Sequence, residues 1–234
     1  MALPKLNTQT FELNVPSTDE KIKFRPFLVK EEKVLLQAQQ SEKPEEMANA
    51  LIQVIKNCTF GKLKADNLPS FDIEYIFLKI RAKSVGEKVE LMITCPDDNE
   101  TKVKHTVDLS KVEVEVDDDH NNNIKLTDTV SVIMSYPTVK TFQGANLVGM
   151  NAEEIVSLTG RCIHQIVDGV ETHERADIED KDMDEFLENL TQGQFAEIQK
   201  FFTTMPKLKH EVKVTNPKTK KKGTVTLQGM QSFF

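Results

Sequence analysis

The amino-acid sequence predicts an α+β fold in which helices pack against antiparallel β-hairpins. Apolar residues recur at helical spacing in several stretches and at alternate positions in others, with turn residues between them. The chain has 234 residues, 38% of them hydrophobic, which is enough for one large or two small cores. We expect two halves, residues 1–116 and 124–234, either as separate domains or as parts of one compact domain.

The first half opens with a predicted β-hairpin. Residues 10–15 and 21–25 alternate in polarity around the turn PSTDE, and Pro26 ends the second strand because it cannot donate a backbone hydrogen bond. Helices are then expected over residues 30–40, 44–58 and 71–83. Pro44 begins the second of these, and Ser70 is the expected N-cap of the third. Strands with a polar face follow over residues 88–94, 102–109 and 112–116.

The second half begins after the polar run DDDHNNN at 117–123, which we expect to be a loop or a domain boundary. Short strands are predicted at 124–126 and 130–135. A helix capped by Asn151 and Glu154 is expected to continue through Ile166 and to end at Asp168-Gly169. Two shorter helices are expected to open at Asp182 and at Thr191. A closing hairpin is predicted over 209–215 and 224–228.

An internal similarity relates the two long hairpins. Glu90–Pro96 resembles Glu211–Pro217, and each segment follows an apolar helix and precedes a polar turn. Two helix-plus-hairpin units are one interpretation. The other is that short alternating strands resemble one another by construction.

The helix at 71–83 carries two apolar stripes, and we expect it to be the core helix of the fold. The first stripe contains Ile73, Ile76, Phe77 and Ile80, and the second contains Phe71, Tyr75, Leu78 and Ala82. Such a helix needs cover on two sides, from the chain itself or from a partner. Tyr75 and Leu78 are therefore candidate partner-binding residues.

Phe233 and Phe234, the last two residues, are candidates for the same role. Two exposed phenylalanines lower solubility, so we expect these side chains either to pack back on the domain or to fill a pocket of a partner.

Composition argues against several classes of partner. The 30 Lys and Arg against 37 Asp and Glu give a formal charge of -7, the wrong sign for wrapping nucleic acid. No apolar run approaches the ~20 residues that span a bilayer, so no membrane partner is expected. Cys58, Cys95 and Cys162 are widely spaced and are expected to be reduced thiols.

Motif searches give no catalytic, cofactor or metal site, and we expect a non-enzymatic protein. Glycine-rich phosphate loops and a hydrolase elbow are absent from the sequence. Residues 117–128 partly match the count of a calcium loop but lack its glycine, so a solvated loop is favoured. No two histidines are spaced for metal binding on a helix. A lysine cluster could bind phosphate, although a solvated hairpin tip is the simpler interpretation; it contains Lys218, Lys220, Lys221 and Lys222.

Several strings resemble the baseplate hub assembly family of T4-type contractile-tailed phages, most closely its cyanophage-like hub subunits. They are LPKLNT, VPSTDEKIKFRPFLVKEEK, IKNCTFG, LPSFDIEYIFLKIRAKSVGE, FFTTMPKLKH and LQGMQSFF, and the stretch at 68–87 is the most specific. The resemblance implies a viral protein that binds other baseplate hub or tail proteins. It would act in the host bacterial cytoplasm during assembly or in the virion tail baseplate. The pattern P-S-x-x-x-x-I-x-x-R-P also resembles tail assembly chaperones, which gives the alternative function.

The resemblance bears on metal binding as well. Some relatives carry C-P-x-C at both hairpin turns, the pattern of a zinc ribbon. Here Cys95 keeps one thiol, Asp98 stands at the second position, and Asn216-Pro217 begins a turn without cysteine. Because a structural zinc site needs four ligands, we expect no metal and two hairpins held together by packing alone.

Overall fold

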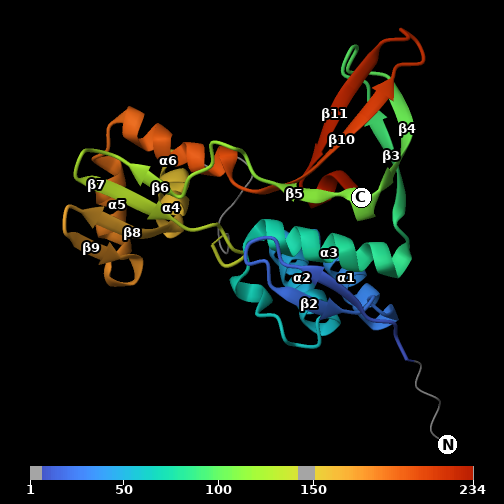
Figure 1. Cartoon of the computed structure of the whole chain (residues 1–234), viewed down its shortest axis with the longest axis horizontal. Coiled ribbons are helices and arrows are strands. Elements are labelled where there is room, and N and C mark those ends of the chain that lie inside the picture. Colours follow the sequence, from blue (N-terminus) through green and yellow to red (C-terminus); the bar gives the residue numbers. More distant parts are fainter. Residues whose placement is uncertain (1–6, 142–150, 234) are drawn as a thin grey trace, which may run out of the picture. The chain divides into compact units, whose positions relative to one another are not determined.

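The computed structural model describes residues 7–141 and 151–233, and its α+β architecture is the one predicted (Figure 1). The chain forms two compact units. Unit 1 contains Met1–Glu115 and Lys207–Phe234, and unit 2 contains Val116–Pro206. The C-terminal hairpin thus belongs with the N-terminal elements, whereas the sequence suggested two consecutive halves.

Unit 1 begins with an antiparallel hairpin and three helices. The hairpin pairs β1 (Phe11–Asn14) with β2 (Lys21–Phe24). The helices are α1 (Val29–Ser41), α2 (Pro44–Cys58) and α3 (Ser70–Val85), with the 3₁₀ turn η1 (Ala65–Asn67) before α3. These elements confirm the predicted hairpin and helices. The expected Ser70 cap is wrong, because Pro69 is the N-cap and its carbonyl accepts the backbone N–H groups of Asp72 and Ile73.

The remaining strands of unit 1 form two small sheets. β3 (Lys88–Thr94) pairs with β4 (Lys102–Asp108). β5 (Glu113–Glu115), β10 (Lys207–Thr215) and β11 (Lys222–Gln228) form a second antiparallel sheet in the order β11-β10-β5. The 3₁₀ turns η2 (Leu109–Lys111) and η4 (Met230–Phe233) complete the unit.

Helix α3 is the core helix of unit 1, as its sequence predicts. Ile73, Ile76, Phe77 and Ile80 of the first stripe are all buried. On the second stripe, Leu78 and Ala82 pack into a cluster supplied mainly by the two sheets: Leu91, Ile93, Val107, Leu109, Val112, Leu208, Val212, Val214, Leu227 and Phe233. The chain itself therefore covers both sides of α3.

Unit 2 is built on a four-stranded antiparallel sheet in the order β6-β7-β8-β9. Its strands are β6 (Asn123–Lys125), β7 (Val130–Met134), β8 (Ile163–Asp168) and β9 (Glu171–Glu174). Its helices are α4 (Ala152–Cys162), α5 (Asp180–Glu188) and α6 (Gln192–Thr204), and the 3₁₀ turn η3 (Arg175–Asp177) precedes α5. Apolar residues of sheet and helices share one core, which includes Val132, Ile163, Met183, Ile198 and Phe201.

Two expectations for unit 2 are wrong. The helix predicted to reach Ile166 ends at Cys162, and the following residues form β8, where Ile163 and Ile166 pack into the core. Asp168-Gly169 does not end a helix: Asp168 is the last residue of β8 and pairs with Glu171, and Gly169, with a positive φ of 60°, begins the two-residue turn to β9. Helix α5 also begins earlier than predicted, at Asp180.

Candidate partner-binding groove

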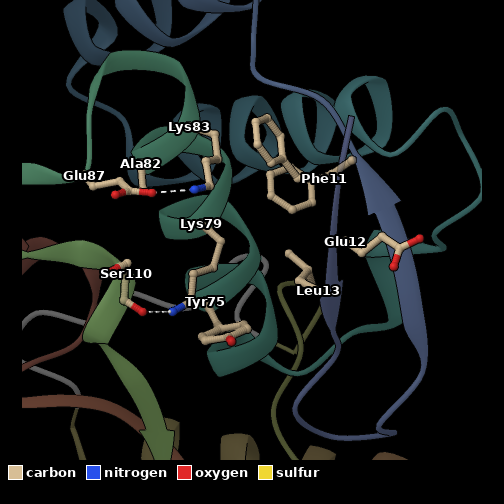
Figure 2. A pocket seen from close by; sticks show the side chains of 10 residues that line it. Phe11, Glu12, Leu13, Tyr75, Lys79, Ala82, Lys83, Glu87 and Ser110 are labelled. Carbon is tan, nitrogen blue, oxygen red and sulfur yellow. Dashed lines mark hydrogen bonds and ion pairs between the residues drawn. The ribbon is translucent and has the colours of Figure 1, made fainter. Parts of the chain in front are cut away.

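An open groove of about 400 Å³ lies between β1 and α3 in unit 1 (Figure 2). Phe11 and Leu13 line it from β1 and Glu12 points away, as alternation along a strand requires. The Phe11 ring lies 5.7 Å from that of Phe24 between centroids, which makes this wall aromatic. Glu12 instead pairs with Lys21 on β2 at 2.6 Å.

The α3 wall of the groove is formed by residues at helical spacing, including Tyr75, Lys79 and Lys83. The Lys79 ammonium donates to the carbonyl oxygens of Ser110 and Val112 and to Oε1 of Glu113, each at 2.9 Å. It also lies 4.8 Å from the Tyr75 ring centroid. These contacts fix the Tyr75 ring and the loop after β4 against one side of α3.

Lys83 stands at the other end of the groove, with its ammonium 5.1 Å from the Phe11 ring centroid and paired with the Glu87 carboxylate. The groove thus combines aromatic and aliphatic surface with two cations, one of them satisfied by three oxygens. Such a surface suits binding of a protein segment, because apolar contact area supplies affinity and the ammonium groups orient polar atoms.

The described lining of the groove is suited to contact with a partner and holds no pair of catalytic groups. Burial, and secondarily the Glu113 carboxylate, raise the pKa of Tyr75 to about 12, so its phenol stays protonated at neutral pH. The ten described lining residues include no histidine or cysteine. They therefore offer no pairing of a nucleophile with a histidine base.

The structure separates the four predicted partner-binding residues. Tyr75 is half-buried and lines the groove. Leu78 and Phe233 are each 0% exposed inside the core of unit 1, so neither side chain is available to a partner while the unit is folded. Phe234 lies outside the described residues. The contribution of β1 to the groove was not predicted, because no local pattern shows that the hairpin lies beside α3.

The P-S-x-x-x-x-I-x-x-R-P pattern consists of residues that fold the opening hairpin. Ser17 donates its backbone N–H to Asp72 Oδ1 at 3.1 Å and its hydroxyl to the other oxygen of that carboxylate, which is buried at the start of α3. Ile22 is a core residue. Arg25 forms a two-pronged bond to the buried Glu31, at 2.9 and 3.3 Å. The pattern therefore joins the hairpin to α1 and α3.

The tips of the two long hairpins are joined by hydrogen bonds as well as packing, which corrects the expectation of packing alone. Nδ2 of the buried Asn216 donates to Asp97 Oδ1 and Asp98 Oδ2, both at 2.9 Å, and the Thr219 hydroxyl donates to Asp97. Thr101, hydrogen bonded to Asp98, lies in the same turn as both carboxylates. This polar network joins the two turns at the positions where a zinc-ribbon pattern would have its cysteines.

The two turns share one backbone pattern. The carbonyl of Cys95 accepts from Asn99 at 3.0 Å, and the carbonyl of Asn216 accepts from Lys220 at 2.9 Å. Asn99 and Lys220 have similar positive φ values, 55° and 63°. The likeness between the hairpins thus extends from sequence to conformation.

Other site types find no support in the described part of the chain. Among residues 7–141 and 151–233, no cluster of His, Cys, Asp and Glu has the arrangement of a metal site. All three cysteines are buried, and burial raises the pKa of the Cys58 thiol to about 11 and that of Cys162 to about 12, which keeps these two thiols protonated and unreactive. No described helix is both long and apolar enough to cross a membrane.

Comparison with known protein families assigns the chain. The family model described as T4 bacteriophage base plate protein matches residues 7–234. The chain belongs to this family. It is therefore a structural phage protein associated with the tail base plate. No curated protein and no solved structure gives a significant match, so the family assignment rests on the match to the family model alone.

Proposed function

We propose that this base plate protein is a non-enzymatic structural or assembly component of the baseplate hub and acts by binding other hub or tail proteins. The observation that carries the proposal is the family match over residues 7–234, which spans nearly the whole chain. The groove between β1 and α3 supplies a surface suited to such binding, and Tyr75 is the aromatic residue that α3 contributes to it.

The alternative is a tail assembly chaperone that binds a tail protein transiently and is absent from the virion. Its support was the P-S-x-x-x-x-I-x-x-R-P pattern. Ser17, Ile22 and Arg25 of that pattern contact the protein's own buried residues. The resemblance to chaperones is therefore explained by the fold of the hairpin and does not indicate a common binding partner. This observation favours the hub component.

The test is to probe purified tails for the chain after sedimentation from infected cells. A hub component stays with the tails, whereas a chaperone is found only in the soluble fraction. Co-purification during assembly should recover hub or tail proteins with the wild-type chain. Recovery of no phage protein at any stage would contradict both forms of the proposal.

The groove is tested separately with Tyr75→Ala. We expect this variant to fold and to lose retention in tails, because the ring supplies exposed aromatic surface to the groove. Met92→Ala is the matched control, since Met92 is an exposed apolar residue on β3 that does not line the groove. Equal retention of the two variants would exclude the groove as the binding surface while leaving hub membership intact.

A further inference from the structure

Charge is distributed unevenly along this chain. Residues 207–222 contain seven of the 30 Lys and Arg residues but only one of the 37 Asp and Glu residues. Residues 177–188 show the reverse composition, with seven Asp and Glu and one Lys. The first segment is β10 and the turn to β11 in unit 1, and the second contains α5 in unit 2.

The basic segment forms an ordered, exposed surface. The four lysines of the turn are exposed, and among the described residues none of them has an ion-pair partner: Lys218, Lys220, Lys221 and Lys222. The turn is fixed by Asn216, whose side-chain oxygen accepts the Lys218 N–H at 2.8 Å and whose carbonyl accepts the Lys220 N–H at 2.9 Å. The adjacent carboxylates, Asp97 and Asp98, are engaged by Asn216 and by Thr219 or Thr101. Asp97 and Asp98 keep their negative charge in these hydrogen bonds, and Glu100 adds a third carboxylate to the adjacent turn. The four lysines outnumber these three carboxylates, so the β10–β11 tip keeps an excess of positive charge.

The acidic segment presents its carboxylates on the outer side of α5. Met183 and Leu187 are buried on the inner side. Asp182, Glu185 and Glu188 are exposed on the opposite arc, since residues three apart on a helix lie on neighbouring positions of one side. Asp180 is paired with Arg175, whereas none of the three outer carboxylates forms an ion pair with another described residue.

We propose that the β10–β11 tip of one copy docks on the acidic outer side of α5 in a second copy, giving head-to-tail self-association of the chain. Each molecule carries both complementary surfaces, and among the described residues no ion pair engages the four lysines of the tip or the three outer carboxylates of α5. Such a contact joins two different patches, so it repeats from copy to copy and builds a ring or an open chain. Exposed ion pairs are individually weak, so the association is modest in dilute solution and favoured where an assembly holds copies close together.

The test is sedimentation of the full chain over a range of concentrations at about 50 mM and about 500 mM NaCl, where screening differs strongly. We expect concentration-dependent self-association at low salt and about tenfold weaker association at high salt. Lys218→Glu, Lys221→Glu and Lys222→Glu together should abolish it. The matched control reverses Lys33, Lys62 and Lys64, three exposed lysines outside the hairpin, and should leave it unchanged.

A charge-swap experiment identifies the acidic surface. The chain with Asp182→Lys, Glu185→Lys and Glu188→Lys should also be monomeric, with the helical circular dichroism of the wild type. Mixing it with the hairpin-reversed chain should restore association, because each variant then offers charges opposite to those of the other.

Three outcomes overturn the proposal. They are a wild-type chain that is monomeric at low salt, an equal loss of self-association in the hairpin-reversed and control variants, and a mixture of the two charge-reversed variants that does not associate. Binding of a DNA duplex by the wild-type hairpin without self-association would assign the basic surface to nucleic acid instead.

Discussion

Tyr75 and Leu78 show how neighbouring residues on one helical stripe acquire different roles. Both lie on the second apolar stripe of α3, yet Leu78 is fully buried beneath the strands whereas Tyr75 is half-buried at the groove. The sequence predicts the stripe because helical periodicity is local. It cannot tell which member of the stripe is covered, because that depends on strands up to 150 residues away along the chain, such as β11.

Leu78→Ala is expected to lower the free energy of unfolding by about 2–5 kcal/mol, since it removes a fully buried side chain and leaves a cavity. Leu36→Ala is the control: Leu36 is 52% exposed on α1, so its truncation should change stability by about 0.5 kcal/mol or less. Urea denaturation followed by circular dichroism measures both. Equal effects would mean that α3 is not the core helix.

The buried Arg25–Glu31 pair provides a second prediction at this scale. Glu31 is 1% exposed and also accepts the Leu28 N–H at 2.9 Å. Arg25→Met leaves this buried carboxylate with only the exposed Lys30 ammonium, 3.5 Å away, and should destabilise the protein by about 3 kcal/mol. Adding Glu31→Met should recover much of the loss, because two apolar side chains of similar length can pack where the ion pair stood. A double variant as unstable as the single one would argue against a paired role.

At the scale of elements, the sequence predicted best where a helix carries its own N-capping residues. The expected capping pairs are present at Asn151 with Glu154 and at Thr191 with Gln194, and α6 begins where predicted. Strand β8 was missed because Ile163 and Ile166 also fit a helical stripe, and only pairing with β7 makes them strand residues. Strand β9 is almost wholly polar and has no alternation to detect. The groove was missed for the same reason as β8, since it arises from contact between distant elements.

The linked hairpin tips should be sensitive to acid. Hydrogen bonds from Thr219 and then Asn216 lower the pKa of Asp97, and those from Thr101, Glu100 and Asn216 hold the pKa of Asp98 well below its usual range. A carboxyl whose folded pKa is below its unfolded value of ~3.9 stabilises the fold above that value and loses the contribution as pH falls through the folded pKa. The tips should therefore hold above about pH 5 and loosen below about pH 4.

Carboxyl carbon chemical shifts in an NMR titration measure this effect directly. In the wild type, the Asp97 and Asp98 resonances should titrate below the usual aspartate range. Asn216→Ala removes a donor to both carboxylates, so both midpoints should rise. Wild-type midpoints near 3.9 would show that the tips are not joined in this way.

The close approach of the tips also depends on Gly223. A Cβ built on this residue would lie 2.5 Å from Cγ of Pro96, a distance that forces one hairpin to shift. Gly223→Ala should therefore separate the tips and lower the melting temperature. Gly193→Ala is the control, since no atom lies within 4 Å of its added Cβ and alanine favours the helix in which it sits. An unchanged melting temperature for Gly223→Ala would contradict this close packing.

At the scale of the whole molecule, the chain leaves one sheet of unit 1 and returns to the same sheet after completing unit 2. Glu115 at the end of β5 and Lys207 at the start of β10 are direct partners in the antiparallel ladder. Unit 2 thus occupies the position of a hairpin loop. The sequence predicts a loop or a boundary at 117–123, and unit 2 begins at Val116. It could not show the return, because pairing of 113–115 with 207–209 leaves no local pattern.

This topology predicts that unit 1 folds without unit 2. Replacing residues 116–206 by Asn-Gly would join two directly opposed residues through a two-residue turn that suits antiparallel strands. We expect a cooperatively unfolding protein that retains the unit 1 core. Every residue of the buried cluster around Leu78 and Ala82 lies in the retained segments. Its amide NMR spectrum should reproduce most unit 1 resonances of the full chain.

The control joins Val114 to Lys207 through the same turn. This shifts the pairing of β5 with β10 by one residue, which moves alternate side chains to the opposite face of the sheet. That variant should be clearly less stable. If both shortened chains were equally unfolded, unit 1 would depend on unit 2 for its stability, and the division into two units would describe packing without independent folding.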